Sequence, residues 1–231
     1  MKARLIGEPE LQFRARNRHI DPRYGVAVYG PADADSPSAP RDITVGLVGP
    51  ASAVDGMRGW LERCQAPIEA KEAKPGQENL HQPFPGFSTG TSFGAQLVFD
   101  DALVREIPGR QLRTLANTDV KAAVAEGAGL YADAARSLAE TGRCRVILCA
   151  RPEEIREHDS EPPAPGEDAG GEEEQAETQI GRDFHDMLKA QALGLACPLQ
   201  VMRRETWEGT VRRGEASRPL QDEATRAWNL H

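Results

Sequence analysis

A helical segment that leads directly into a short apolar segment occupies residues 179–206, and it constrains the fold more than any other part of the chain. Phe184, Leu188 and Leu195 have the spacing of one helix face. The apolar run at 198–202 follows at once and is short enough for a buried strand. This segment therefore predicts a helix that packs against a sheet, with the next strand of that sheet directly behind it.

Strand and helix patterns alternate through the earlier part of the chain as well. A β-branched strand at 42–48 precedes a helix at about 53–64, and a second strand is expected at 95–99. The longest helical pattern, 119–141, precedes the most continuous apolar strand, 145–150. This order predicts an α/β fold of Rossmann-like type, in which helices flank a central parallel sheet.

The first part of the chain has a different pattern. Residues 1–31 contain two candidate strands, 10–14 and 26–29, joined by a turn with Pro and Gly, so we expect an N-terminal β-hairpin. The polar residues 32–41 are expected to form a linker. Four arginines make the hairpin basic, and they fit either a solvated surface or a contact with nucleic acid: Arg14, Arg16, Arg18 and Arg23.

The charge of the chain is unevenly distributed. The formal net charge is −8, but residues 157–177 hold nine acidic side chains and no Lys or Arg, so the rest of the chain has a net charge of +1. This Pro- and Gly-containing acidic stretch predicts a disordered insertion, either a solvated loop or a segment that competes for a basic pocket. A nearly neutral domain can bind one phosphate in a local pocket, but it cannot coat a duplex through charge alone.

The cysteines and the apolar runs exclude several classes of protein. Cys64, Cys144, Cys149 and Cys197 show neither CxxC spacing nor a zinc-ligand pattern with His, so we expect reduced thiols and no metal site. The sequence contains neither a long apolar run for a membrane span nor a secretion leader. A cytoplasmic protein without a membrane partner is therefore expected.

Three polar side chains converge near the predicted helix–strand junction. His185 and Lys189 are four residues apart and share one helix face, and Gln200 lies in the following strand. Gly194 is expected to end the helix with a positive φ. A cation, a polar ring and an amide close together are typical of an anion site, and phosphate is the anion expected.

The spacing from His185 through Lys189 and a GLACPLQ turn to Gln200 resembles the MID domain of the Argonaute/Piwi family. In that family the corresponding residues hold the 5′-phosphate of a guide strand, and the place of His185 usually carries Tyr. Further segments resemble short prokaryotic Argonautes: Glu8–Phe13, Asp21–Gly25, Tyr29–Pro31 and Leu220–Leu230. The resemblance implies that residues 42–231 form a MID-like domain.

The resemblance also implies roles for other residues. Arg182 would add a contact to the 5′-phosphate, and Asn229 takes the position of an Asn at the guide end. A second phosphate-binding Lys of the family would lie beyond His231, so the chain would stop before the PIWI domain. Further residues are candidates for contacts with the guide backbone or a base, although the last of them would equally cover the core: Arg203, Arg204 and Trp207.

The implied function is binding of a single-stranded RNA or DNA guide and its target, as part of a guided defence protein with a PIWI domain or a separate effector partner. The nuclease of the family lies in PIWI, so no catalytic residue is expected here. In the intact protein a Mg or Mn ion at the guide 5′-phosphate is compatible with the resemblance. Two alternatives remain: an α/β protein-interaction module, and a small-molecule-binding domain without guide binding.

Overall fold

The computed structural model describes residues 7–72, 81–153, 184–213, 216–219 and 222–229. The acidic stretch at 157–177 therefore lies outside the described residues. Contacts divide the chain into two compact units, each formed from separate stretches of sequence. The first unit comprises Met1–Ile43, Trp60–Leu97 and Gly209–His231, and the second comprises Thr44–Gly59 and Val98–Glu208. These units cut across the expected segments 1–31, 32–41 and 42–231, because the chain leaves the sheet region after Gly59 and later returns.

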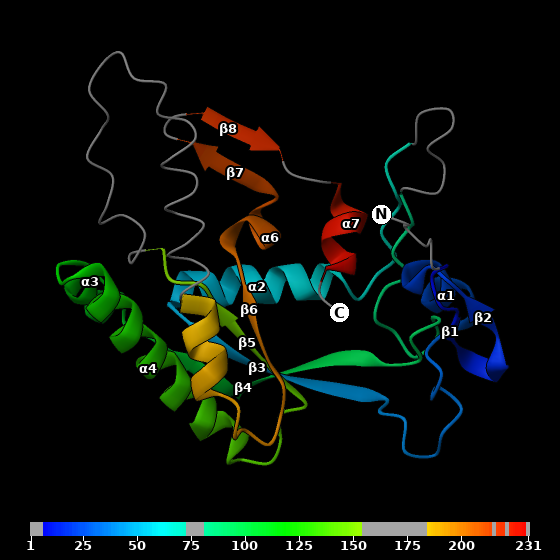
Figure 1. Cartoon of the computed structure of the whole chain (residues 1–231), viewed down its shortest axis with the longest axis horizontal. Helices are drawn as coiled ribbons and strands as arrows, with labels where there is room; N and C mark the ends of the chain where they lie inside the picture. Colours follow the sequence, from blue (N-terminus) through cyan, green and yellow to red (C-terminus); the bar gives the residue numbers. More distant parts are fainter. Residues whose placement is uncertain (1–6, 73–80, 154–183, 214–215, 220–221, 230–231) are drawn as a thin grey trace, which may run out of the picture. The chain divides into compact units, whose positions relative to one another are not determined.

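A parallel four-stranded sheet forms the centre of the second unit (Figure 1). Its strands are β3 (Asp42–Gly49), β4 (Gln96–Glu106), β5 (Val146–Ala150) and β6 (Leu199–Met202), in the spatial order β4-β3-β5-β6. β5 pairs in parallel with both β3 and β6. In the β3–β4 pair, one hydrogen bond joins the starts of the two strands and another joins their ends, so this pair is parallel as well. The α/β fold with a parallel sheet is thereby confirmed.

Helices connect these strands, and all of them except α3 were predicted from the sequence. They are α2 (Ala51–Arg63), α3 (Gly109–Ala116), α4 (Val120–Ala139) and a helix over residues 184–191. Asp119 caps α4 by accepting hydrogen bonds from two backbone N–H groups, and Gly142, with φ of 65°, lies in the turn after it. Right-handed crossovers place α2 on one face of the sheet, and α4 and the 184–191 helix on the other.

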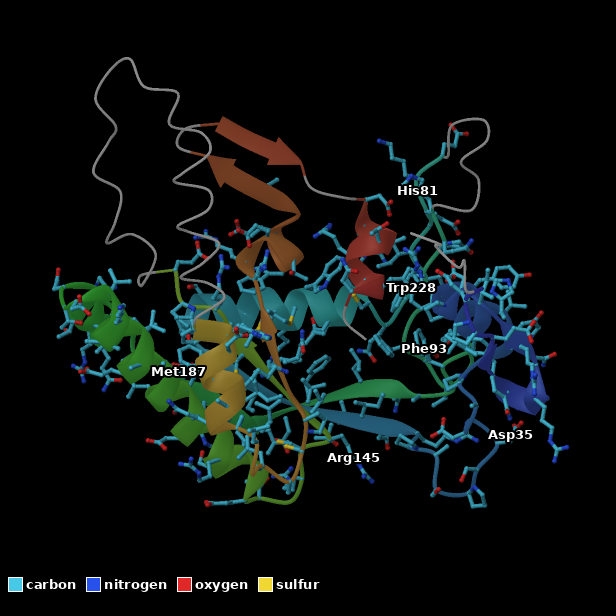
Figure 2. The ribbon with its side chains drawn as sticks, in the orientation of Figure 1. Asp35, His81, Phe93, Arg145, Met187 and Trp228 are labelled. Atoms are coloured by element: carbon cyan, nitrogen blue, oxygen red, sulfur yellow. The ribbon has the colours of Figure 1, made fainter. Side chains whose placement is uncertain are left out.

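The first unit contains short strands and small helices. They are β1 (Leu11–Gln12), β2 (Arg18–His19), α1 (Pro22–Tyr29), β7 (Thr210–Arg213), β8 (Ala216–Pro219) and α7 (Glu223–Trp228). A short helix, α6 (Arg204–Glu208), ends the second unit. Phe84 and Trp228 are almost fully buried, with ring centroids 5.3 Å apart, and Phe93 joins them (Figure 2). The aromatic rings near residue 84 therefore pack in the core of this unit.

One predicted strand is wrong. Residues 26–29 belong to helix α1, and the hairpin is instead formed by β1 and β2. The Asp21 side chain accepts hydrogen bonds from the backbone N–H groups of Arg23 and Tyr24, and Pro22 occupies the first helical position. These two N-terminal signals outweigh the β-branched and aromatic composition of the last turn.

Most arginines of the hairpin region have acidic partners. Arg14 pairs with Asp35 at 2.5 Å, and Arg18 lies 3.8 Å from Glu10. Arg23 lies 3.9 Å from the Asp21 carboxylate that caps α1. This arrangement favours a solvated surface over a basic patch for nucleic acid.

Within the described residues, none of the helices has both the length and the apolar character needed to cross a bilayer.

The turn between β1 and β2 offers a test of local backbone strain. Its central residues, Ala15 and Arg16, have φ of 54° and 63°, a left-handed conformation that favours Asn and Gly. We expect the double substitution Ala15→Asn and Arg16→Gly to raise the free energy of unfolding of the hairpin by about 1 kcal/mol. Amide hydrogen exchange at Phe13, whose N–H donates to the Asn17 carbonyl, measures this change. The control Arg18→Gly, within β2, should not slow exchange; equal slowing in both variants would contradict the explanation.

The Asp222 carboxylate is expected to make the free energy of unfolding depend on pH in the acid range. Partial burial raises its pKa, but hydrogen bonds from Thr225 and the nearby His81 ring outweigh burial and hold the pKa below its ordinary value of 3.8. The carboxylate therefore stabilises the fold above about pH 4, and this contribution is lost as the pH falls through the lower folded-state pKa. Asp222→Ser keeps a helix cap without a charge, so its unfolding free energy should fall less than that of the wild type between about pH 4 and pH 2. Parallel curves from denaturant titrations would contradict this.

Candidate functional site

The helix at 184–191 is held by apolar packing on one side. Phe184 and Leu188 are 2% and 0% exposed, and the Phe184 ring meets the Tyr131 ring of α4 edge to face, at 5.4 Å between centroids. This packing fixes the rotation of the helix about its axis. Met187 lies on the exposed side (Figure 2), and Lys189 is half-buried between the two sides.

The helix ends without a left-handed residue, so the expectation for Gly194 was wrong. Gly194 is not among the residues with positive φ. The last turn instead tightens, and the Ala192 N–H donates to the carbonyls of both Leu188 and Lys189. The Leu195 N–H then donates to the Ala192 carbonyl, which closes the turn toward β6.

Lys189 reaches the open edge of the sheet. β6 is an edge strand, and its Pro198 and Met202 carbonyls accept hydrogen bonds from the neighbouring β5 region. The Leu199 carbonyl between them therefore faces away from β5. The Lys189 ammonium donates to this Leu199 carbonyl and lies 3.4 Å from Oε1 of Gln200.

Gln200 comes to this edge from the opposite face of the sheet. Leu199 and Val201 pack against the core below α4, whereas the Gln200 side chain, on the other face, is exposed. Lys189 thus extends around the edge strand from one face and meets Gln200, which comes from the other. The sequence predicted this pair, and the structure brings the two side chains together.

His185 lies one turn before Lys189 and points to a different partner. Its Nδ1 is 2.9 Å from Oδ1 of Asp186, and the two side chains are 43% and 67% exposed. The ring is therefore accessible, but the contact described for it is to a carboxylate. A phosphate at this ring would have to displace Asp186 or approach the opposite ring nitrogen.

The residues after β6 have other partners. The Arg204 guanidinium lies 2.6 Å from the Glu208 carboxylate within α6, and this hydrogen bond raises the pKa of Arg204. Trp207 packs on α2, where a Cβ added at Gly56 would lie 2.5 Å from the indole nitrogen. Trp207 therefore covers the core, and Arg203 alone of the three candidates is an exposed side chain without a described ion pair.

The structure does not position two other predicted residues relative to this pair. Asn229 follows α7 in the first unit, where its backbone N–H donates to the Arg226 carbonyl. Arg182 lies outside the described residues. The geometry of the candidate site therefore rests on Lys189 and Gln200, with His185 one turn away.

Sequence reasoning missed Arg151, a charged residue that is only 9% exposed. It follows β5 directly, and its backbone N–H donates to the Met202 carbonyl. Arg151 lies at the carboxyl end of the sheet, next to the boundary between β3 and β5. The chain runs from β3 to β4 on one side of β3 and then crosses to β5 on the other side, and ligands of open α/β sheets bind at such a point. The signal in the sequence was a single arginine at the end of the most apolar strand.

The described residues at this pair do not fit a divalent cation. The Gln200 Oε1 and Leu199 carbonyl oxygens both face the ammonium of Lys189, which would repel a metal ion. No group of three or more His, Cys, Asp or Glu side chains suited to a metal occurs within the described part of the chain. The pair suits an anion, because the ammonium keeps a further N–H and the Gln200 amide can donate beside it.

Replacing Lys189 tests its contact with the edge strand. Lys189→Met keeps the apolar stem but removes the donor to the Leu199 carbonyl, so the free energy of unfolding should fall by about 1 kcal/mol. Lys189→Arg, which retains donors, should lose less. Denaturant unfolding at equilibrium measures both. Unchanged stability in the Met variant would show that the ammonium does not hold the edge strand.

No known protein-family model matches the chain, and no curated protein matches it. The candidate site is therefore defined by the sequence pattern and by the geometry of Lys189 and Gln200.

Proposed function

We propose that this chain binds the 5′-phosphorylated end of a single-stranded guide, as a MID-like part of an Argonaute-type guided defence protein. The observation that carries the proposal is the meeting of the Lys189 ammonium and the Gln200 amide at an exposed sheet edge. They are eleven positions apart in the sequence, so their contact depends on the fold. The spacing that resembles the MID pattern and this contact involve the same two residues.

A terminal phosphate suits this pair better than a long anionic surface would. Lys189 provides a compact charge with several donors, and Gln200 adds a neutral donor that fixes orientation. One such pair can hold one phosphate group. Because the chain has a net charge of −8, long-range attraction to a duplex is weak, and recognition of a single charged end fits the charge distribution better.

His185 is proposed to contact the first base or the phosphate of the guide. Its ring is accessible and lies on the same helix, one turn from Lys189.

The proposed role is recognition and not cleavage. The pair of Lys189 and Gln200 offers donors to an anion but no carboxylate to activate water. Cutting or signalling would then depend on a PIWI domain or a separate effector, and cytoplasmic action on foreign nucleic acid belongs to the same proposal.

Binding of short single strands with and without a 5′-phosphate tests this function. We expect the phosphate to tighten binding, and Lys189→Ala to remove about 1.5–3 kcal/mol of that gain, or roughly 10- to 100-fold in Kd. Gln200→Ala should remove a smaller part. Matched controls are Lys71→Ala and Gln12→Ala, which change exposed side chains of the same types in the first unit.

Equal affinity for phosphorylated and unphosphorylated strands would contradict the proposal. Strand binding indifferent to the 5′ end, or no strand binding, would favour a protein-interaction module or a small-molecule domain instead. Losses of equal size in the Lys71 and Lys189 variants would show a general charge effect. Circular dichroism of each variant separates loss of binding from loss of folding.

A further inference from the structure

The solvent-facing side of α3 carries arginines without acidic neighbours in the helix. Leu112 and Leu115 are buried in the core beneath α4, so Arg110 and Arg113 are left on the exposed side, about one turn apart. The other exposed side chains of this helix are neutral. Arg110 and Arg113 therefore form a basic surface on a chain that is acidic as a whole.

Two exposed arginines near the end of α4 show the usual compensation, whereas Arg145 and Arg203 have no described ion pair. Arg136 pairs with Asp133 at 2.5 Å, and Arg143 pairs with Asp100. Arg110 and Arg113, by contrast, have no ion pair with any described residue, and no carboxylate lies on their helix. The exposed side of α3 is therefore complementary to a polyanion whose charges repeat at short intervals.

The topology separates α3 from the candidate phosphate site. α3 follows β4, which is one edge of the sheet, while Lys189 and Gln200 lie at β6, the other edge. Three strand spacings of about 4.8 Å, or about 14 Å, separate the two edge strands, and α3 begins beyond the carboxyl end of β4 whereas Lys189 bonds to the start of β6. A nucleic-acid strand that rises about 3.4 Å per nucleotide therefore needs more than about four nucleotides to reach from Lys189 to α3.

We propose that Arg110 and Arg113 form a second contact, for the phosphodiester backbone of the same strand whose 5′ end lies at Lys189. This inference rests on the proposed function and adds a path for the strand from β6 toward α3. The contact is to phosphates and carries no sequence preference. It should matter only for strands long enough to reach α3.

The salt dependence of binding measures this contact separately from recognition of the 5′ end. A single-strand phosphate contact contributes about 0.7 to the slope of log K against log salt, so Arg110→Ala with Arg113→Ala should lower the slope by about 1.4 for a strand of roughly 16 nucleotides. Binding of a strand of roughly 3 nucleotides, and the preference for a 5′-phosphate, should not change, because such a strand falls short of α3.

A matched control removes the same charge elsewhere. Arg136→Ala with Arg143→Ala changes two exposed arginines that are already paired, with Asp133 and Asp100. This control should leave the slope unchanged. Equal slopes in the wild type and the α3 variant, or an equal drop in the control, would overturn the inference.

The two proposals fail in different ways. A lost 5′-phosphate preference in Lys189→Ala with an unchanged slope in the α3 variant supports the proposed function and rejects the second contact. If the wild type binds strands equally well with and without a 5′-phosphate, the proposed function is rejected. A lower slope in the α3 variant would then show a backbone contact, but not one to a strand whose 5′ end lies at Lys189. No binding of either strand by the wild type rejects both.

Discussion

The packing of the 184–191 helix against α4 determines where the candidate site lies. Phe184 and Leu188 are buried beside Tyr131, and this contact fixes both the rotation of the helix and the side from which Lys189 leaves it. Interiors are densely packed, so a buried aromatic pair leaves little freedom for such a rotation. The position of the ammonium at β6 is thus a consequence of apolar packing on the opposite side of the same helix.

At the edge strand, two roles compete for the ammonium group of Lys189. An exposed edge presents unpaired carbonyls, and a lysine over the edge both satisfies one of them and discourages pairing with other chains. The same ammonium is the charge that would hold a phosphate. A ligand at Lys189 would therefore share the donor with the Leu199 carbonyl, which links occupancy of the site to the stability of β6.

Most of the α/β core could be predicted from local pattern. The strands β3, β5 and β6 and helix α4 follow from β-branched runs, helical spacing and the Asp119 cap. Helix α1 was missed because its cap at Asp21 outweighs residues that favour strands. Helix α3 and the β7–β8 hairpin were not predicted either, since their short segments carry few apolar residues and depend on neighbours supplied by the fold.

The sequence by itself determined the order of the four strands of the central sheet and of helices α2, α4 and 184–191, and it identified His185, Lys189 and Gln200 as candidates, because spacing and residue type are local properties. Only the tertiary structure decided that Lys189 and Gln200 meet around an edge strand while His185 contacts Asp186. It also placed Trp207 against Gly56 and divided the chain into two units. These outcomes depend on strand order and on burial by distant segments, which no local pattern specifies.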